Sequence, residues 1–150
     1  MSAPDVFERA ELFLSRFTFR DMLWLPFESY DTMEEHTIGC VTPLYIACSI
    51  GYTDVAYMLL VKGADVNICN QNHESSLFTA AEKGHLEIVK LLLEPNVNPN
   101  ICNEDNESPL FIASLNGHVK VVEYLLQFNA DCNIANRFNE TPLSIAVIRA

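Results

Sequence analysis

The chain has 150 residues, of which 49% are hydrophobic and 19% charged, enough for one globular domain with its own core. Its formal net charge is −11, and its 9 Lys and Arg residues are scattered among 20 acidic ones. Nucleic-acid binding needs clustered basic side chains, and an acidic surface repels anionic membranes. We therefore expect no nucleic acid and no membrane as partner, whereas a basic protein would be attracted.

Residues 1–27 are predicted to form an N-terminal helical cap, which Pro26 should end. Six apolar side chains recur on one helical face: Val6, Phe7, Ala10, Phe13, Leu14 and Phe17. A cap would cover the surface that the first unit of a stacked array leaves open. The alternative is a helix that binds a partner through three aromatic anchors, Phe17, Phe19 and Trp24. Residues 28–37 are predicted to be an acidic connection.

The cellular setting is predicted from the first residues and the cysteines. The early acidic residues and interrupting arginines are wrong for a leader, and no apolar stretch is long enough to span a bilayer. Five cysteines include no C-x-x-C pair: Cys40, Cys48, Cys69, Cys102 and Cys132. We expect a reducing cytoplasmic or nuclear location, with the cysteines serving as small core residues.

Short motifs recur every 33 residues beyond residue 38. The recurring elements are the triplets Thr42-Pro43-Leu44, Ser75-Ser76-Leu77, Ser108-Pro109-Leu110 and Thr141-Pro142-Leu143, the glycines Gly51, Gly84 and Gly117, and the asparagines Asn67, Asn100 and Asn133. Leucine pairs follow the same period. The sequence therefore predicts a repeat array over 38–150, with units at 38–70, 71–103 and 104–136 and a partial unit at 137–150.

Each unit is predicted to contain two helices. The hydroxyl residues Thr42, Ser75, Ser108 and Thr141 are good N-caps, and proline follows three of them at the first helical position. The repeated glycine can end this helix in the left-handed conformation. A second helix, such as Leu86 to Leu93 or Val119 to Leu126, should end at Gly63, Asn96 or Asn129, whose residue types tolerate the same conformation.

The segments Gly84–Leu93 and Gly63–Asn67 resemble ankyrin repeats, and the resemblance covers about residues 38–150. It implies an all-α solenoid of stacked helix–turn–helix units joined by β-turn-like loops. The family's signature histidine is replaced by Tyr45, Phe78, Phe111 and Ser144, so we expect more aromatic packing between units. The glycine before each cap is replaced by Cys40, His73, Asn106 and Asn139. Asn and His tolerate a positive φ, at a higher cost than glycine.

The resemblance implies a module that binds another protein through its turn tips and the concave face of its first helices. Carried onto this sequence, the binding positions are Gln71, Asn72, Glu74, Glu82, Lys83, Glu104, Asp105, Glu107, Leu115, Asn116, Arg137, Phe138 and Glu140. Further positions are Ile38, Val41, Ser49, Ile50, Cys69 and Cys102. The middle of this surface is acidic, so the hypothesis is a partner with Lys or Arg beside an apolar anchor. The alternative is that the turns are simply solvated.

No catalytic arrangement is found: phosphate-binding loop, nucleophile elbow and paired carboxylates are all missing, so we expect no enzyme, no cofactor and no small-molecule substrate. His85 and His118 are equivalent, but helices stacked about 8–10 Å apart hold them too far apart for one metal ion. The pattern of Leu59 with Asp65-Val66-Asn67 resembles the asparagine hydroxylation site of eukaryotic ankyrin proteins, so Asn67 is a candidate. The alternative is that Asn67, Asn100 and Asn133 only hydrogen-bond the turn between units.

The fourth unit ends at Ala150, after its first helix, so Ile145 and Ile148 are expected to lack a covering second helix. We interpret the chain as a fragment of a longer array, or as a short product that pairs through this end. The alternative function is accordingly a targeting or regulatory domain of a larger enzyme or channel.

Asn96→Gly and Asn129→Gly should each stabilise the fold by about 0.5–1 kcal/mol, because glycine adopts the left-handed conformation without steric cost. Equilibrium urea denaturation measures this change. A loss of stability in both variants would refute the left-handed assignment.

Overall fold

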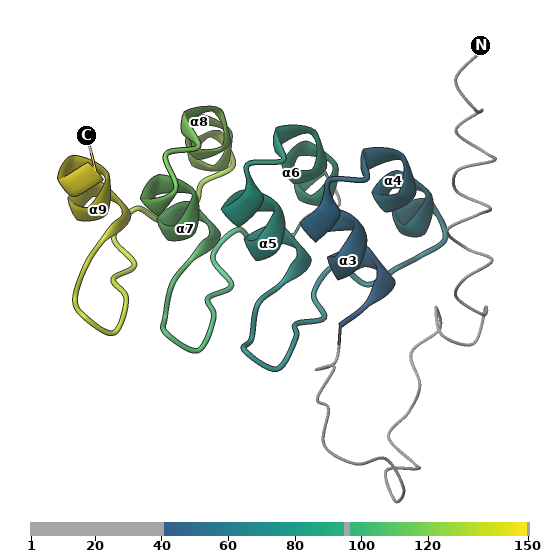
Figure 1. Cartoon of the computed structure of the whole chain (residues 1–150), viewed down its shortest axis with the longest axis horizontal. Helices are drawn as coiled ribbons and strands as arrows, with labels where there is room; N and C mark the ends of the chain where they lie inside the picture. The colour runs from purple at the N-terminus through teal and green to yellow at the C-terminus, as the bar shows by residue number, and fades with distance from the viewer. Residues whose placement is uncertain (1–40, 95–96, 150) are drawn as a thin grey trace, which may run out of the picture.

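The computed structural model describes residues 41–94 and 97–149. In these ranges the helices are α3 (Pro43–Ile50), α4 (Thr53–Val61), α5 (Ser76–Lys83), α6 (Leu86–Leu93), α7 (Pro109–Leu115), α8 (Val119–Gln127) and α9 (Pro142–Arg149), and they include no named strand. The pairs α3–α4, α5–α6 and α7–α8 stack side by side, followed by α9, and the loops between pairs project to one side (Figure 1). The all-α solenoid is therefore confirmed.

Several predictions from the sequence concern residues outside the described ranges. These are the helical cap at 1–27, the acidic connection at 28–37, and the positions Ile38, Cys40 and Asn96.

Hydroxyl side chains begin the first helix of every unit, as predicted. Thr42 Oγ1 accepts a hydrogen bond from the Tyr45 N–H at 3.1 Å, and Ser75 and Ser108 cap α5 and α7 over the same distance. At the start of α9, Thr141 Oγ1 accepts a hydrogen bond from the Ser144 N–H at 3.2 Å. Each bond satisfies an amide that has no partner within the helix. The repeated Thr or Ser thus sets the register of the four first helices.

Left-handed residues end the helices and shape the turns. Gly51, Gly84 and Gly117 follow the first helices with φ of 88°, 75° and 72°, and Asn129 follows α8 with φ of 60°. The non-glycine residues expected at positive φ in the turns also adopt it: His73, Asn106 and Asn139. The predicted backbone geometry is therefore confirmed at these positions, despite its cost for a residue with a Cβ atom.

The core runs through the stack as one continuous apolar cluster. The repeated leucines Leu44, Leu77 and Leu110 are each 1% exposed. They lie on α3, α5 and α7, and each of these helices packs against its own second helix and against the first helix of the next unit. Phe78 and Phe111, on α5 and α7, are also buried. Burial of a large apolar side chain contributes about 1.5–3 kcal/mol, so neighbouring units stabilise one another.

Two expectations about apolar residues were partly wrong. Ile145 is buried because it faces α7, whereas Leu143, Val147 and Ile148 are about 70% exposed on the outer side of α9. Of the described cysteines, Cys48 is a core residue, but Cys132 is exposed in the turn after α8, and both are free thiols. Burial raises the pKa of Cys48 to about 12.

Gly84→Ala should destabilise the protein more than Gly117→Ala. The two glycines have nearly the same φ, so each variant loses about 1–2 kcal/mol through backbone strain. A Cβ atom at Gly84 would also lie 2.6 Å from the His118 ring, whereas one at Gly117 would meet nothing within 4 Å. This clash should cost about 1–3 kcal/mol more. Urea denaturation compares the two variants, and equal losses would contradict a steric role for His118.

Candidate partner-binding surface

The loop between units closes into a tight turn at a repeated asparagine. Between the first and second units the Asn70 N–H donates to the Glu74 carbonyl at 3.0 Å, and the His73 N–H donates to the Asn70 carbonyl at 3.1 Å. The same two backbone bonds recur at Asn103 and Asn136. The predicted β-turn-like loop is therefore confirmed at all three described tips.

The side chain of the same asparagine fastens the turn from inside. Asn70 Oδ1 accepts from the backbone N–H groups of Asn72 and Glu74, both at 2.9 Å, and Asn70 Nδ2 donates to Glu74 Oε2 at 2.7 Å. Equivalent bonds are made by Asn103 with Asp105 and Glu107, and by Asn136 with Phe138 and Glu140. A single amide thus satisfies two backbone donors and orients one carboxylate.

The sequence prediction missed these three asparagines. Their signal was available: Asn70, Asn103 and Asn136 lie 33 residues apart, and a glutamate follows each one after four residues. Asparagine favours turns because its short side chain can hydrogen-bond the backbone two residues on. Both interpretations of the acidic turn residues, a binding surface or a solvated turn, left out a hydrogen bond within the turn itself.

Neighbouring tips are joined to one another by backbone hydrogen bonds. The Glu104 N–H donates to the Asn72 carbonyl at 3.0 Å, and the Arg137 N–H donates to the Asp105 carbonyl at 2.9 Å. Asn106 Nδ2 adds a bond to the Ala135 carbonyl at 2.6 Å. The three tips therefore form one continuous edge, with their positions set by the backbone.

Exposed side chains of different chemistry project from this edge. Gln71, Asn72 and Glu104 are exposed, and so are Arg137 and Phe138. Phe138 is 67% exposed, so its ring is available to a partner. The Arg137 guanidinium lies 4.9 Å from the centre of the Phe138 ring, and its Nη1 forms an ion pair with Asp105 at 2.6 Å. The structure thus brings Asp105, Arg137 and Phe138 together, at the neighbouring tips of Asn103 and Asn136.

The predicted acidic residues fall into two groups. The carboxylates of Glu74, Glu107 and Glu140 are half-buried and hydrogen-bonded within their turns, so they serve the turn itself. Glu82 and Lys83 pair with each other at 3.3 Å at the end of α5, where exposure weakens the attraction. Glu104 is the predicted tip glutamate whose side chain is exposed.

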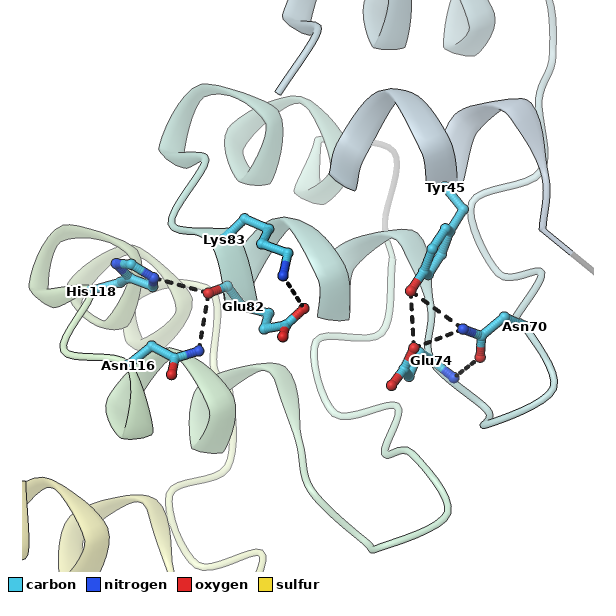
Figure 2. A network of polar contacts seen from close by, with 7 residues as sticks. All are labelled: Tyr45, Asn70, Glu74, Glu82, Lys83, Asn116 and His118. Carbon is cyan, nitrogen blue, oxygen red and sulfur yellow. Dashed lines mark hydrogen bonds and ion pairs between the residues drawn. The ribbon is translucent and has the colours of Figure 1, made fainter. Parts of the chain in front are cut away.

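A polar link joins the first and second units, beside the tip. The Tyr45 hydroxyl donates to Glu74 Oε2 at 2.9 Å and accepts from Asn70 Nδ2 at 3.3 Å (Figure 2). Burial, followed by this bond to Glu74, raises the pKa of Tyr45 to about 12, so the hydroxyl keeps its proton. At the equivalent positions Phe78 and Phe111 are buried, whereas Tyr45 makes this hydrogen bond to the next unit.

A second polar link joins the second and third units at the ends of α5 and α7. His118 Nε2 and Asn116 Nδ2 both lie within hydrogen-bond distance of the Glu82 carbonyl, at 2.9 and 3.0 Å (Figure 2). The His118 ring sits against Gly84, and the His85 ring sits equally close to Gly51. Both histidines thus have a structural role in joining units. Lys83 and Asn116 are exposed at this link, whereas Leu115 is half-buried.

The asparagines at the start of each loop have different environments. Asn100 Oδ1 accepts from the Asp131 N–H at 2.8 Å, so the structural interpretation is confirmed for Asn100. The Asn67 N–H donates to Asp65 Oδ1 at 2.9 Å, and the Asn67 residue is exposed. Hydroxylation at Asn67 stays a prediction.

In the described part of the chain, no three His, Cys, Asp or Glu side chains gather where they could hold a metal ion. Within the same residues, no helix has the length and hydropathy to cross a membrane.

The comparisons with known proteins agree with this architecture. A family model described as "Ankyrin repeats (3 copies)" matches residues 21–101 and 77–149, which together span most of the chain. Its first match begins inside the segment predicted to be the N-terminal cap. Among curated proteins, none matches the sequence at a significant level.

Asn103→Ala should lower the free energy of unfolding by about 1–3 kcal/mol, because the backbone N–H groups of Asp105 and Glu107 lose their acceptor. Asn116→Ala is the matched control, since it removes one amide that makes a single hydrogen bond at the surface. Urea denaturation gives both values. A loss for Asn103→Ala no larger than that for Asn116→Ala would contradict the role assigned to Asn103.

Proposed function

The chain belongs to the ankyrin-repeat family, and from that premise we propose that it binds a protein partner through its turn tips and the concave face of its first helices. Ankyrin repeats generally act as protein–protein interaction modules. The observation that supports this surface is the contrast between a constant frame and variable side chains at the tips. The frame is the Asn–Glu turn, which recurs three times with the same bonds.

The side chains that this frame presents differ at every tip. Gln71, Glu104 and Arg137 are equivalent by the repeat, and so are Asn72, Asp105 and Phe138. One position thus carries a neutral, an acidic and a basic residue in turn. Folding of the turn does not require this variation, because the backbone bonds are the same at all three tips. Such a surface suits recognition of one partner sequence by several fixed positions.

The exposed residues indicate the chemistry of the partner. Glu104 offers an acidic side chain, and Phe138 at the next tip offers an apolar contact. Asp105 adds little charge, because Arg137 already pairs with it. The partner therefore carries Lys or Arg for Glu104 and an apolar side chain for Phe138, and the chain's net charge of −11 favours its approach.

The spacing of the units limits how those two partner residues are separated. Neighbouring helices pack about 8–10 Å apart, and an extended chain rises about 3.3 Å per residue. A basic and an apolar residue separated by about three positions in an extended segment would reach both tips. The Glu82–Lys83 pair and Asn116 lie on the concave side, where the same segment could make polar contacts.

Selection of peptides from a random displayed library on the full chain tests the proposal. We expect selected peptides to combine a basic and an apolar residue, and to lose at least tenfold in affinity for Phe138→Ala. Val119→Ala is the matched control, since Val119 is a comparably exposed apolar residue (64%) on α8, away from the tips. Peptides bound equally by the parent chain and Phe138→Ala would refute the proposed surface.

Glu104→Gln tests the electrostatic part separately. Loss of one exposed charge contact should weaken binding of the selected peptides by about two- to fivefold at low salt, and less at high salt. Glu87→Gln is the control, because Glu87 is an exposed acid on α6 that pairs with Lys90 of the same helix. Equal binding by both variants at low salt would contradict the assignment of Glu104.

A further inference from the structure

The outer face of α4 is defined by Tyr57 and Val61, which are 55% and 66% exposed. The two residues are four positions apart and therefore lie one above the other on the same side of the helix. Val55, Ala56 and Leu59 occupy the opposite side and are buried in the core. The apolar pair thus contributes nothing to the stacking of α4 against its own unit.

The other units provide an internal comparison for these positions. Tyr57 corresponds by the repeat to Lys90 in α6 and Glu123 in α8, and Val61 corresponds to Glu94 and Gln127. The second and third units therefore carry charged or polar residues where the first unit carries two large apolar ones. Because the three helices occupy the same place in the stack, the repeat fold does not require the apolar pair.

The first unit is also less covered on its α3 helix. Ile46 is half-buried, whereas the equivalent Ile112 and Ile145 are 9% and 8% exposed. The helices that carry these two isoleucines, α7 and α9, each pack against the first helix of the preceding unit. Among the described helices, α3 and α4 have a neighbouring unit on one side only (Figure 1). The first unit therefore combines a less buried isoleucine on α3 with two exposed apolar residues on α4.

We propose that residues 6–17 of the same chain bind this surface as an amphipathic helix, with their apolar face on Tyr57 and Val61. An exposed apolar pair at positions i and i+4 can be covered by the apolar face of another helix. The segment has such a face, because six of its apolar side chains recur at helical spacing: Val6, Phe7, Ala10, Phe13, Leu14 and Phe17. Its opposite face carries charged residues, among them Arg9 and Arg16, that would remain in water.

Chain connectivity and charge favour this occupant over a second copy. Residues 28–40 separate the predicted cap from the first described residue, and 13 residues reach at most roughly 45 Å. That length exceeds the spacing of neighbouring helices, about 8–10 Å, so the tether does not prevent the contact. A tethered segment has an effective concentration on the order of millimolar. Two copies that each carry a net charge of −11 would instead repel one another.

Hydrogen exchange of the full chain, followed by mass spectrometry, tests the proposal. Val61→Glu and Tyr57→Glu introduce acidic residues of the kind found at the same positions in the second and third units. In the parent chain we expect slow exchange over residues 6–17, and in the double variant at least tenfold faster exchange there. The amides of α5 to α8 should stay protected, which would show that the array remains folded.

Leu126→Glu is the matched control, because Leu126 is an exposed apolar residue (46%) on α8 in the third unit. It should leave exchange over residues 6–17 unchanged. Fast exchange of this segment in the parent chain would overturn the proposal, and so would an equal effect of Leu126→Glu. Sedimentation showing that the parent chain is a dimer and the double variant a monomer would assign the surface to a second copy and also overturn it. None of these outcomes depends on binding at the tips.

Discussion

The side chain of one asparagine holds each turn tip, and the rest of the candidate binding surface depends on that interaction. Asn103, for example, accepts from two backbone N–H groups and donates to Glu107. These polar groups are therefore hydrogen-bonded within the turn itself. These bonds stabilise a turn in which Asn106 adopts a positive φ, a conformation that costs a non-glycine residue about 1–2 kcal/mol. Asn106 in return donates to the Ala135 carbonyl beside the next tip, a bond that glycine could not make.

The contacts between units are not equivalent, although the repeat is regular. Tyr45 joins the first two units through a hydrogen bond to Glu74, whereas Phe78 and Phe111 are buried at the corresponding positions. His118 contacts both Gly84 and the Glu82 carbonyl, so the glycine serves the packing of a ring as well as a left-handed helix end. Polar links thus lie toward the tips and the concave side, while apolar contacts form the core.

The period of 33 residues predicted most of the fold, because caps, glycines and buried leucines each have a local chemical reason to recur. The roles of the acidic turn residues were harder to predict. A glutamate that is hydrogen-bonded within its own turn, such as Glu107, cannot be distinguished by composition from an exposed one, such as Glu104. The direction in which Ile145 faces was missed for a related reason: it depends on the contact with α7, which helical spacing alone does not specify.

An NMR titration of the isotope-labelled chain with a peptide selected for binding tests the central claim most directly. The central claim is that asparagine-held tips present the side chains that bind the partner. The account predicts that the largest amide shifts fall on the tips, at Asn72, Glu104, Asp105, Arg137 and Phe138, with little change at Glu87 and Lys90 on α6. Shifts concentrated on α6 and α8, with the tips unmoved, would contradict it.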